Sequence, residues 1–347
     1  MRFFDRQKQA RAQTRQLLLL FALTLLVLVL AINVGLALIW KLLAGASAYP
    51  AGFFTVNTAL VLLFVLGGWW IETSTLAGGG EKLARRAGAR EAWPASREDE
   101  QQLCNVVSEL ALAAGIRAPQ PMVLDRVDSI DAFAAGWNDD DAVLAVTRGA
   151  LDSLTRDELQ GLVAHELGHL REGDTRLNMR LAGMVFGLEL IFNLGRRMCE
   201  ADDDGQRSVF AVPGVAVLAC GSAGWLAGRW LKAAVSRERE FLADARAVQF
   251  TRSRDGLGGV LRKVMGERAG SGIRSGASAA RSLHPSLQHL LLVGPQVETR
   301  WLATHPPLAE RVQRIYGRAM PAMDPMRDAL LTRGPAVAPG QPAIGRW

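Results

Sequence analysis

The amino-acid sequence predicts a mainly α-helical, multi-span membrane protein that also contains a small β-sheet. Two long apolar runs near the N-terminus predict helices that cross a membrane. A segment with a Thr-x-x-Glu start and apolar residues at helical spacing predicts a soluble helix that carries two histidines. A short, partly β-branched segment before that helix predicts a strand. At 347 residues, the chain has room for one soluble domain in addition to its membrane section.

The two apolar runs near the N-terminus predict a transmembrane hairpin over residues 17–71. The first extends from Leu17 to Trp40, which is longer than the roughly 20 residues that a helix needs to cross a bilayer. It exceeds the apolar core of about 7 to 15 residues in signal peptides, and no small-residue cleavage site follows it. The second run, Phe53–Ile71, contains two adjacent tryptophans near its end, and such aromatic pairs are typical of the membrane interface.

Basic residues predict the orientation of this hairpin. The loop between the two runs carries only Lys41, whereas both outer flanks are strongly basic. Because flanks rich in Lys and Arg stay in the cytoplasm, we expect a multi-pass protein of the inner (plasma) membrane with its soluble domain in the cytoplasm. The net charge of +6 comes mostly from these flanks, which disfavours nucleic-acid binding as its reason. The flanking residues are Arg2, Arg6, Lys8, Arg11 and Arg15 before the first run, and Lys82, Arg85, Arg86 and Arg90 after the second.

Two further apolar stretches predict a second hydrophobic hairpin over residues 177–232. Val209–Gly228 is long enough to span a membrane. Leu181–Gly195 is shorter and contains Glu189, so it is either a span or a re-entrant or amphipathic helix. Glu189 is accordingly either a functional group inside the membrane or a carboxylate at the wet edge of a short helix. The candidate metal ligands His165, His169 and Glu240 lie on both sides of this hairpin. Because they must meet at one metal ion, the chain between them crosses the membrane either twice or not at all. We expect four spans in total.

The predicted soluble helix begins at a capping box formed by Thr155 and Glu158 and continues with apolar residues at about 3.6-residue spacing. Gly168 lies inside it and costs about 1 kcal/mol of helix propensity relative to alanine. A glycine at this position indicates that backbone, metal or substrate approaches closely there.

The segment 165–169, with the sequence HELGH, has the spacing of a zinc-protease signature. Four residues advance a helix by about 400°, so His165 and His169 lie one turn apart on one face and can share one tetrahedral cation. Glu166 lies about 100° round from His165, where it can act as a general base on a bound water. The same pattern also occurs by chance in ordinary charged helices, so a third ligand is needed to support the prediction.

The best candidate for the third ligand is Glu240, in the charged segment 236–244. It would complete a His-His-Glu site, which leaves the fourth position of the metal open for water. Asp244 lies one helical turn later and can accept the free N–H of a ligating histidine. Glu238 is the rival ligand, but it lies about 200° from Glu240 on the helix. The alternative interpretation is a charged surface helix in which the neighbouring arginines pair with these acids.

These residue types predict metal-assisted hydrolysis of a peptide bond. Zinc lowers the pKa of a bound water from about 15.7 towards 7 and polarises the scissile carbonyl. Glu166 would take the proton of the attacking, zinc-activated water and return it to the leaving amine. Such a zinc-dependent hydrolysis needs no Ser or Cys nucleophile.

Residues 141–147 predict a strand between turn-forming residues. If this strand is an exposed edge, it can pair with an extended substrate and recognise main chain before side chains. The residues expected to bind substrate in this way are Ala142, Val143, Leu144 and Ala145. An ordinary core strand is the alternative interpretation from the residues alone.

Three motifs, in this order, resemble those of the HtpX family, integral-membrane zinc metalloendopeptidases with the zincin-type HExxH domain that are relatives of the CaaX prenyl proteases. They are the pentad 165–169, the segment 236–244 and the segment Thr304–Arg311, with the sequence THPPLAER. Residues 131–136 and 146–151 also resemble that family, so the resemblance covers most of the chain from about Asp125 to Arg311. Where the family usually has asparagine, this chain has Asp131, which leaves the role of that position open.

The resemblance implies that His165, His169 and Glu240 hold one zinc ion per chain. It further implies that Glu166 is the catalytic carboxylate, that Asp244 supports a histidine, and that residues 142–145 have the edge role. His305 is expected to face the site, where it assists the transition state or approaches the metal. The structural alternative for His305 is a histidine fixed before a Pro-Pro turn.

The function that the resemblance implies is quality control at the cytoplasmic face of the membrane. Its substrates would be unfolded, damaged or misassembled membrane proteins, and membrane quality-control proteins would be partners. A CaaX-type processing protease and a non-catalytic membrane adaptor that retains the fold are the alternatives. A transporter is disfavoured because Glu189 alone offers an ionisable group within the apolar stretches.

Cys104, Cys199 and Cys220 are an odd number at spacings unlike a disulfide framework, which fits a reducing cytoplasm.

The sequence divides into six predicted sections. The sections are a basic cytoplasmic tail (1–16), the transmembrane hairpin (17–71), the first part of the peptidase domain (72–176), the second hydrophobic hairpin (177–232), the second part of the peptidase domain (233–325) and a disordered tail (326–347).

Overall fold

The structure is a computed structural model that describes the chain except for residues 1, 46–47, 201–210, 271–291, 293–304 and 325–347. It is mainly helical with one small four-stranded sheet, so the predicted fold class is confirmed. The predicted tail 326–347 lies outside the described residues.

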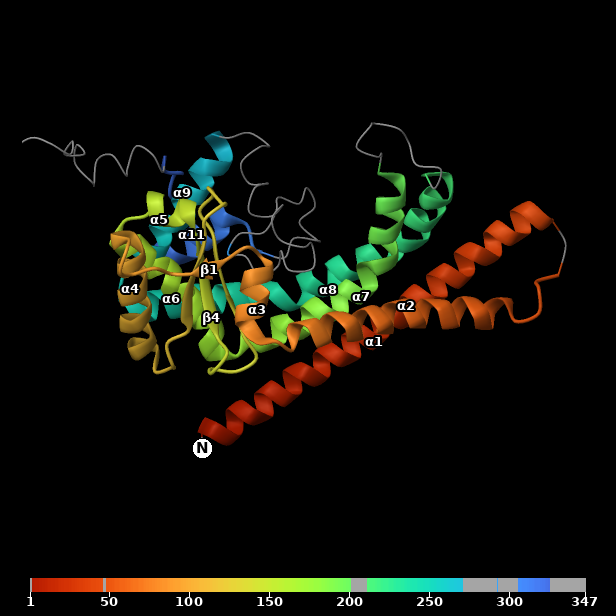
Figure 1. Cartoon of the computed structure of the whole chain (residues 1–347), viewed down its shortest axis with the longest axis horizontal. Helices are drawn as coiled ribbons and strands as arrows, with labels where there is room; N and C mark the ends of the chain where they lie inside the picture. Colours follow the sequence, from red (N-terminus) through yellow and green to blue (C-terminus); the bar gives the residue numbers. More distant parts are fainter. Residues whose placement is uncertain (1, 46–47, 201–210, 271–291, 293–304, 325–347) are drawn as a thin grey trace, which may run out of the picture.

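The N-terminal membrane hairpin consists of α1 (Arg2–Ala44) and α2 (Phe53–Leu76). Both are long and apolar enough to cross a membrane, as predicted. Asn33 Nδ2 donates a hydrogen bond to Thr58 Oγ1 at 3.0 Å and so joins the two helices. The basic residues 2–16 continue the same helix, and Figure 1 shows this end of α1 extending away from the rest of the chain.

A second hairpin is formed by α7 (Asp174–Cys199) and α8 (Ala211–Thr251), as Figure 1 shows. The helices run antiparallel with their backbones in close contact, because a Cβ added at Gly195 would lie 2.3 Å from Leu218 N and one at Gly224 would lie 2.2 Å from Leu188 O. Among the described residues, α7 is the third helix long and apolar enough to span a membrane. Glu189 accepts a hydrogen bond from the Lys232 ammonium at 3.0 Å, and this buried pair also joins the two helices.

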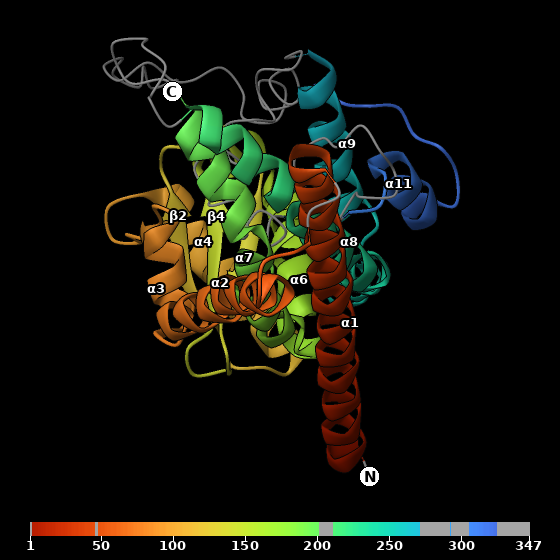
Figure 2. The ribbon, with the colours of Figure 1, turned by 90° about the vertical axis from the view of Figure 1, so that its right-hand side faces the viewer.

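The sheet contains β1 (Arg90–Glu91), β2 (Gln120–Leu124), β3 (Ala132–Ala135) and β4 (Val143–Thr147) in the order β1-β2-β4-β3. β2 and β4 are parallel, and the other two pairs are antiparallel. The helix that carries the two histidines, α6 (Arg156–Glu172), contacts β3 on one side and α8 and α9 (Asp255–Gly270) on the other. Figures 1 and 2 show α6 in this central position.

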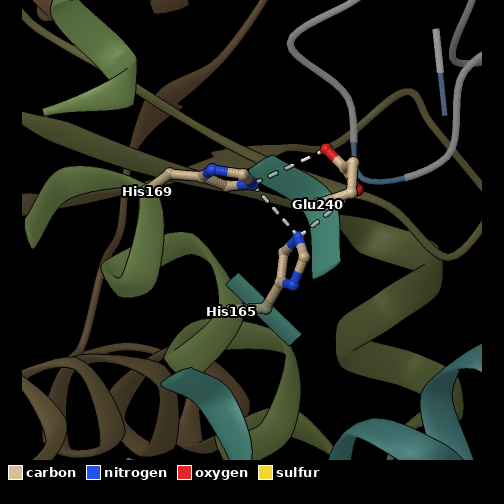
Figure 3. Close-up of side chains that lie close together, drawn as sticks. All are labelled: His165, His169 and Glu240. Carbon is tan, nitrogen blue, oxygen red and sulfur yellow. Dashed lines mark hydrogen bonds and ion pairs between the residues drawn. The ribbon is translucent and has the colours of Figure 1, made fainter. Parts of the chain in front are cut away.

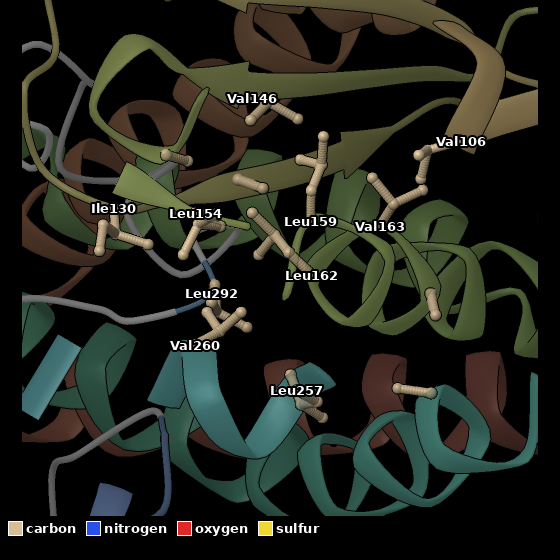
Figure 4. Close-up of a cluster of buried hydrophobic side chains, with 14 of the residues drawn as sticks. Val106, Ile130, Val146, Leu154, Leu159, Leu162, Val163, Leu257, Val260 and Leu292 are labelled. Atoms are coloured by element: carbon tan, nitrogen blue, oxygen red, sulfur yellow. The ribbon is translucent and has the colours of Figure 1, made fainter. Parts of the chain in front are cut away.

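The main hydrophobic core lies between the sheet and the helices that cover one of its faces. Figure 4 shows residues of this core, among them Val106 of α4 (Glu98–Ala114), Val146 of β4, Leu162 of α6 and Val260 of α9. Each of these four side chains is fully buried, and such burial contributes about 1.5–3 kcal/mol per side chain. The position of α6, and therefore of its histidines, is fixed by this packing.

The opposite face of the sheet is covered by the end of α2, by α3 (Gly79–Arg86) and by α7. Buried side chains in this second cluster include Leu76 of α2, Leu83 of α3, Phe133 of β3 and Met179 of α7. The membrane hairpins therefore pack directly against the soluble domain.

Candidate metal centre

The local sequence of α6 places two histidines side by side. The predicted capping box is present: Thr155 N–H donates to Glu158 Oε2 at 2.8 Å, and the Thr155 hydroxyl accepts from Glu158 N–H at 3.4 Å. The helix then continues without a break to Gly173, so His165 and His169 lie one turn apart on the same face. Their Nε2 atoms are 3.2 Å from each other.

Helix α8 brings the third candidate ligand to these histidines. It crosses α6 at Gly168, where an added Cβ would lie 3.3 Å from Ala243 Cα. The glycine thus marks a close approach of backbone, as predicted. At this crossing, Glu240 Oε1 is 3.7 Å from His169 Nε2, and Glu240 Oε2 is 3.8 Å from His165 Nε2. Figure 3 shows the three side chains pointing toward one another.

The three side chains form a donor set that fits a tetrahedral metal ion. In a zinc site with bonds of about 2.0–2.1 Å, neighbouring ligand atoms lie about 3.3 Å apart, which the separations of 3.2, 3.7 and 3.8 Å approach. Among the described residues, these three are the one group of histidine, cysteine and acidic side chains close enough to hold a metal. The side chain of the rival Glu238 lies outside the described residues.

Asp244 supports the site from α8. Its Oδ1 lies 3.0 Å from His165 Nδ1, the ring nitrogen that faces away from the proposed metal position. The structure therefore places Asp244 where the sequence analysis expected it.

Arg311 of α11 (Leu308–Tyr316) is a buried residue of the site that the sequence analysis missed. Its Nη2 and Nε donate to the two carboxylate oxygens of Asp244 at 2.6 and 2.9 Å. Its Nη1 also lies 3.1 Å from Glu240 Oε2. The Arg311 guanidinium thus contacts both Glu240, a candidate ligand, and Asp244, the partner of the candidate ligand His165. It lies in the quoted segment Thr304–Arg311, and the resemblance of that segment to the family was the signal that could have pointed to it.

The second missed residue is Asp174, the first residue of α7. Its Oδ2 forms a hydrogen bond with His169 Nδ1 at 3.0 Å, and its Oδ1 pairs with Arg239 Nη1 from α8. Each candidate histidine ligand therefore has its own buried aspartate, and each aspartate has its own arginine.

The charges around the site favour an anionic Glu240 and a protonated His169. Burial disfavours the charged form of His169, but the hydrogen bond with Asp174 and the charge of Glu240 raise its pKa to about 9. Burial alone would raise the pKa of Glu240, yet His305 and Arg311 hold it well below its usual value. At neutral pH this donor set therefore keeps a carboxylate anion and binds a proton where a divalent cation would bind.

Glu166 has the environment of a base that works near neutral pH. Its side chain is buried beside the histidines, and this burial raises its pKa to about 7. The backbone N–H of Ala134 in β3 donates a hydrogen bond to its carboxylate. Because a general base is most effective when its pKa is close to the working pH, this environment suits the predicted role.

The prediction that residues 142–145 form an exposed edge is wrong. β4 pairs with β2 on one side and with β3 on the other, so its backbone is already hydrogen-bonded in both directions. Its side chains enter both hydrophobic cores, Val143 and Ala145 on one face and Leu144 and Val146 on the other. The edge of the sheet nearest Glu166 is β3, whose Ala132 carbonyl accepts a hydrogen bond from Leu292 N–H at 3.0 Å.

His305 lies next to the candidate ligands. Its Nδ1 is 3.3 Å from Glu240 Oε1, although it comes from a part of the chain remote from both α6 and α8. The imidazole therefore faces the candidate metal centre, where it can contact a bound group.

Asp131, which stands where the resemblance led us to expect asparagine, is buried close to Glu166. Its Oδ1 accepts hydrogen bonds from the N–H groups of Ala132 and Leu292, both at 2.9 Å. Burial raises its pKa well above the usual value.

Comparisons with known proteins agree on one family. The model of "Peptidase family M48" matches residues 97–319. A "Protease HtpX homolog" of Streptococcus thermophilus is 31% identical over 301 residues, which cover 81% of this chain and 94% of that protein. Another, of Dictyoglomus thermophilum, is 30% identical over 292 residues and covers 81% of this chain and 88% of that protein. Among solved structures, the chain is similar to the crystal structure of S. mikatae Ste24p, with a TM-score of 0.38 and 16% identity; the match covers 86% of this chain and 66% of that chain.

Proposed function

This chain belongs to peptidase family M48 and is a membrane metalloprotease, and we propose that it is a zinc-dependent endopeptidase whose active site faces the cytoplasm. The observation that carries the proposal is the convergence of His165, His169 and Glu240 from two distant helices. We assign one zinc ion per chain to these three side chains. When bound, zinc would supply a Lewis acid that polarises the scissile carbonyl and makes water acidic enough to act as a nucleophile.

The chain's own residues would provide the proton transfers. Glu166, whose buried carboxylate lies beside the histidines, takes the proton of the attacking water and returns it to the leaving amine. Asp244 and Asp174 hold the Nδ1 sides of the two imidazoles, so that both Nε2 atoms stay directed at the same point. The imidazole of His305 can donate a hydrogen bond to the carbonyl oxygen as negative charge develops on it.

The substrate backbone is proposed to pair with β3. This strand is the edge next to Glu166, and Leu292 already occupies its Ala132 carbonyl. Residues 132 and 134 point their backbone groups to the same side of a strand, so the Ala134 carbonyl faces the same edge and is proposed to accept from an extended peptide.

Backbone methylation of a model peptide tests this pairing. We expect N-methylation to lower kcat/KM about 2- to 10-fold at alternate residues on one side of the cleaved bond, because each lost hydrogen bond costs about 0.5–1.5 kcal/mol. Methylation at the intervening residues should have less effect, since their N–H groups point away from the edge. Steady-state kinetics on a methyl-scanned peptide series would measure it, and the absence of any alternation would contradict pairing with a strand.

The proposed substrates are unfolded or misassembled membrane proteins. Recognition through main-chain hydrogen bonds suits an enzyme that cleaves many sequences, because every extended peptide presents the same backbone groups. The basic flanks of the α1–α2 hairpin favour a cytoplasmic location for the soluble domain. The site would then meet substrate segments that leave the cytoplasmic face of the bilayer.

Membrane vesicles of defined orientation test both the metal dependence and the proposed face. Inverted vesicles, whose cytoplasmic face is outward, should cleave added unfolded casein, whereas sealed right-side-out vesicles should not. A chelator should abolish the cleavage and stoichiometric zinc should restore it, with vesicles that contain the Glu166→Gln variant as the background control. Chelator-resistant cleavage above this background would overturn the metal assignment, and cleavage by right-side-out vesicles would overturn the orientation.

A further inference from the structure

The aspartate at the start of α7 has contacts that a simple helix-terminal acid would not need. α6 ends at Gly173, whose φ of 77° is readily adopted only by glycine, and this turn directs Asp174 back toward His169. An acid in a first helical turn is common because it complements the helix dipole. Here, however, both carboxylate oxygens are used by other elements, one by His169 Nδ1 and the other by Arg239.

The contact with His169 fixes the orientation of the imidazole. Because Asp174 Oδ2 lies 3.0 Å from Nδ1, the proton of the neutral ring resides on Nδ1 and the lone pair on Nε2 points toward His165 and Glu240. The Asp174 carboxylate is almost fully buried, so water does not compete for this hydrogen bond. Outer partners of this kind typically change metal affinity about 10- to 100-fold.

The contact with Arg239 connects this orientation to the membrane section. Asp174 begins α7, which is long and apolar enough to span a membrane, and Arg239 belongs to α8, which packs along α7. Arg239 also directly precedes Glu240 in the sequence. The pair therefore lies where the α7–α8 hairpin meets two of the candidate ligands.

We infer that Asp174 is a positioning residue for His169, and that Arg239 acts through Asp174 to make the affinity of the metal centre depend on the contact between α7 and α8. This inference rests on the proposed metal site. It assigns to the start of a membrane helix a role in holding the metal.

A matched ion pair in the same region provides the control. Glu172, two residues before Asp174, pairs with Arg246 of α8 at 2.7 Å. This pair also joins the end of α6 to α8, but it has no contact with a histidine ligand among the interactions of the described residues. Loss of Glu172 therefore removes a neighbouring, more exposed ion pair between the same region and α8 without removing a contact to His169.

Zinc affinity of the full-length protein in detergent, measured by competition with a chelator, tests the inference. We expect Asp174→Ala to weaken zinc binding about 10- to 100-fold, Asp174→Asn to weaken it less because an oxygen acceptor remains, and Glu172→Gln to leave it unchanged. Arg239→Gln should weaken binding in the wild-type background but have no further effect in the Asp174→Ala background, because the arginine acts through the aspartate.

The outcomes separate this inference from the proposed function. Absence of zinc binding by the wild-type protein would overturn both. Wild-type affinity in Asp174→Ala and Asp174→Asn would overturn the positioning role while leaving the zinc site in place. Equal weakening by Glu172→Gln and Asp174→Ala would show a general structural effect and would also overturn it.

Discussion

Replacing Glu166 with glutamine is expected to lower the rate of peptide cleavage by about 10²- to 10⁴-fold, the usual contribution of a general base, without loss of zinc. Glutamine has nearly the same shape as glutamate, but its amide cannot accept the proton of the attacking water. The residue is buried and its carboxylate accepts the Ala134 N–H, a hydrogen bond that the glutamine oxygen can still accept. Cleavage of casein and zinc content per chain, measured on the same preparation, give the two readouts.

A second variant on the same helix, α6, serves as the control for Glu166→Gln. Glu172→Gln removes a carboxylate from the last residue of α6, where it pairs with Arg246 rather than facing the candidate metal centre. That variant should keep both full zinc content and normal turnover. A Glu166→Gln protein that cleaves casein at the wild-type rate would show that another group serves as the base.

The parts of the site predicted from sequence are those that depend on one helix at a time. The capping box at Thr155 and Glu158 fixes where α6 begins, and the 3.6-residue period then places His165 and His169 on one face. The same period relates Glu240 to Asp244 on α8. Such relations are local, so they follow from spacing before any tertiary contact is known.

Asp174 was missed because helical periodicity points away from it. On a continuous helix, a residue five positions after His169 lies about 140° round the axis, so it would not contact the same imidazole. The chain instead turns at Gly173, and Asp174 begins a new helix with its carboxylate against His169. A helix end at that glycine was the information required.

Arg311 was missed for a different reason. It pairs with Asp244 from another helix, α11, and the two residues are 67 positions apart. A lone arginine on a short helix is usually exposed, whereas Arg311 is fully buried because two acids surround it. Which acids a cation meets is a tertiary property that spacing along the chain does not reveal.

The sequence of the strand itself argues against the prediction that residues 142–145 form an exposed edge. Residues 143–146 are all apolar, and an unbroken apolar run is typical of a strand that is buried on both faces. An edge strand with one exposed face would alternate between apolar and polar residues. Strand order itself depends on how β2, β3 and β4 pair across loops, and single-sequence patterns do not determine it.

The second large effect is expected for Glu240→Ala, which should remove most of the bound zinc and abolish cleavage. The loss in affinity should exceed the 10- to 100-fold that is typical when an outer partner of a ligand is removed, because a ligand atom itself disappears. Zinc content after dialysis against a weak chelator, together with casein cleavage, measures it.

The fold should survive this substitution, which makes the result interpretable. Removing one partner of a buried ion pair is strongly destabilising, by about 3–5 kcal/mol, when the other charge is left unpaired. Arg311 keeps its two hydrogen bonds to Asp244 at 2.6 and 2.9 Å when Glu240 is absent, so its charge remains compensated. The metal-free wild-type and Glu240→Ala proteins should therefore unfold at similar temperatures. Full zinc content in a folded Glu240→Ala protein would instead transfer the third-ligand role to another acid, with Glu238 as the first to substitute.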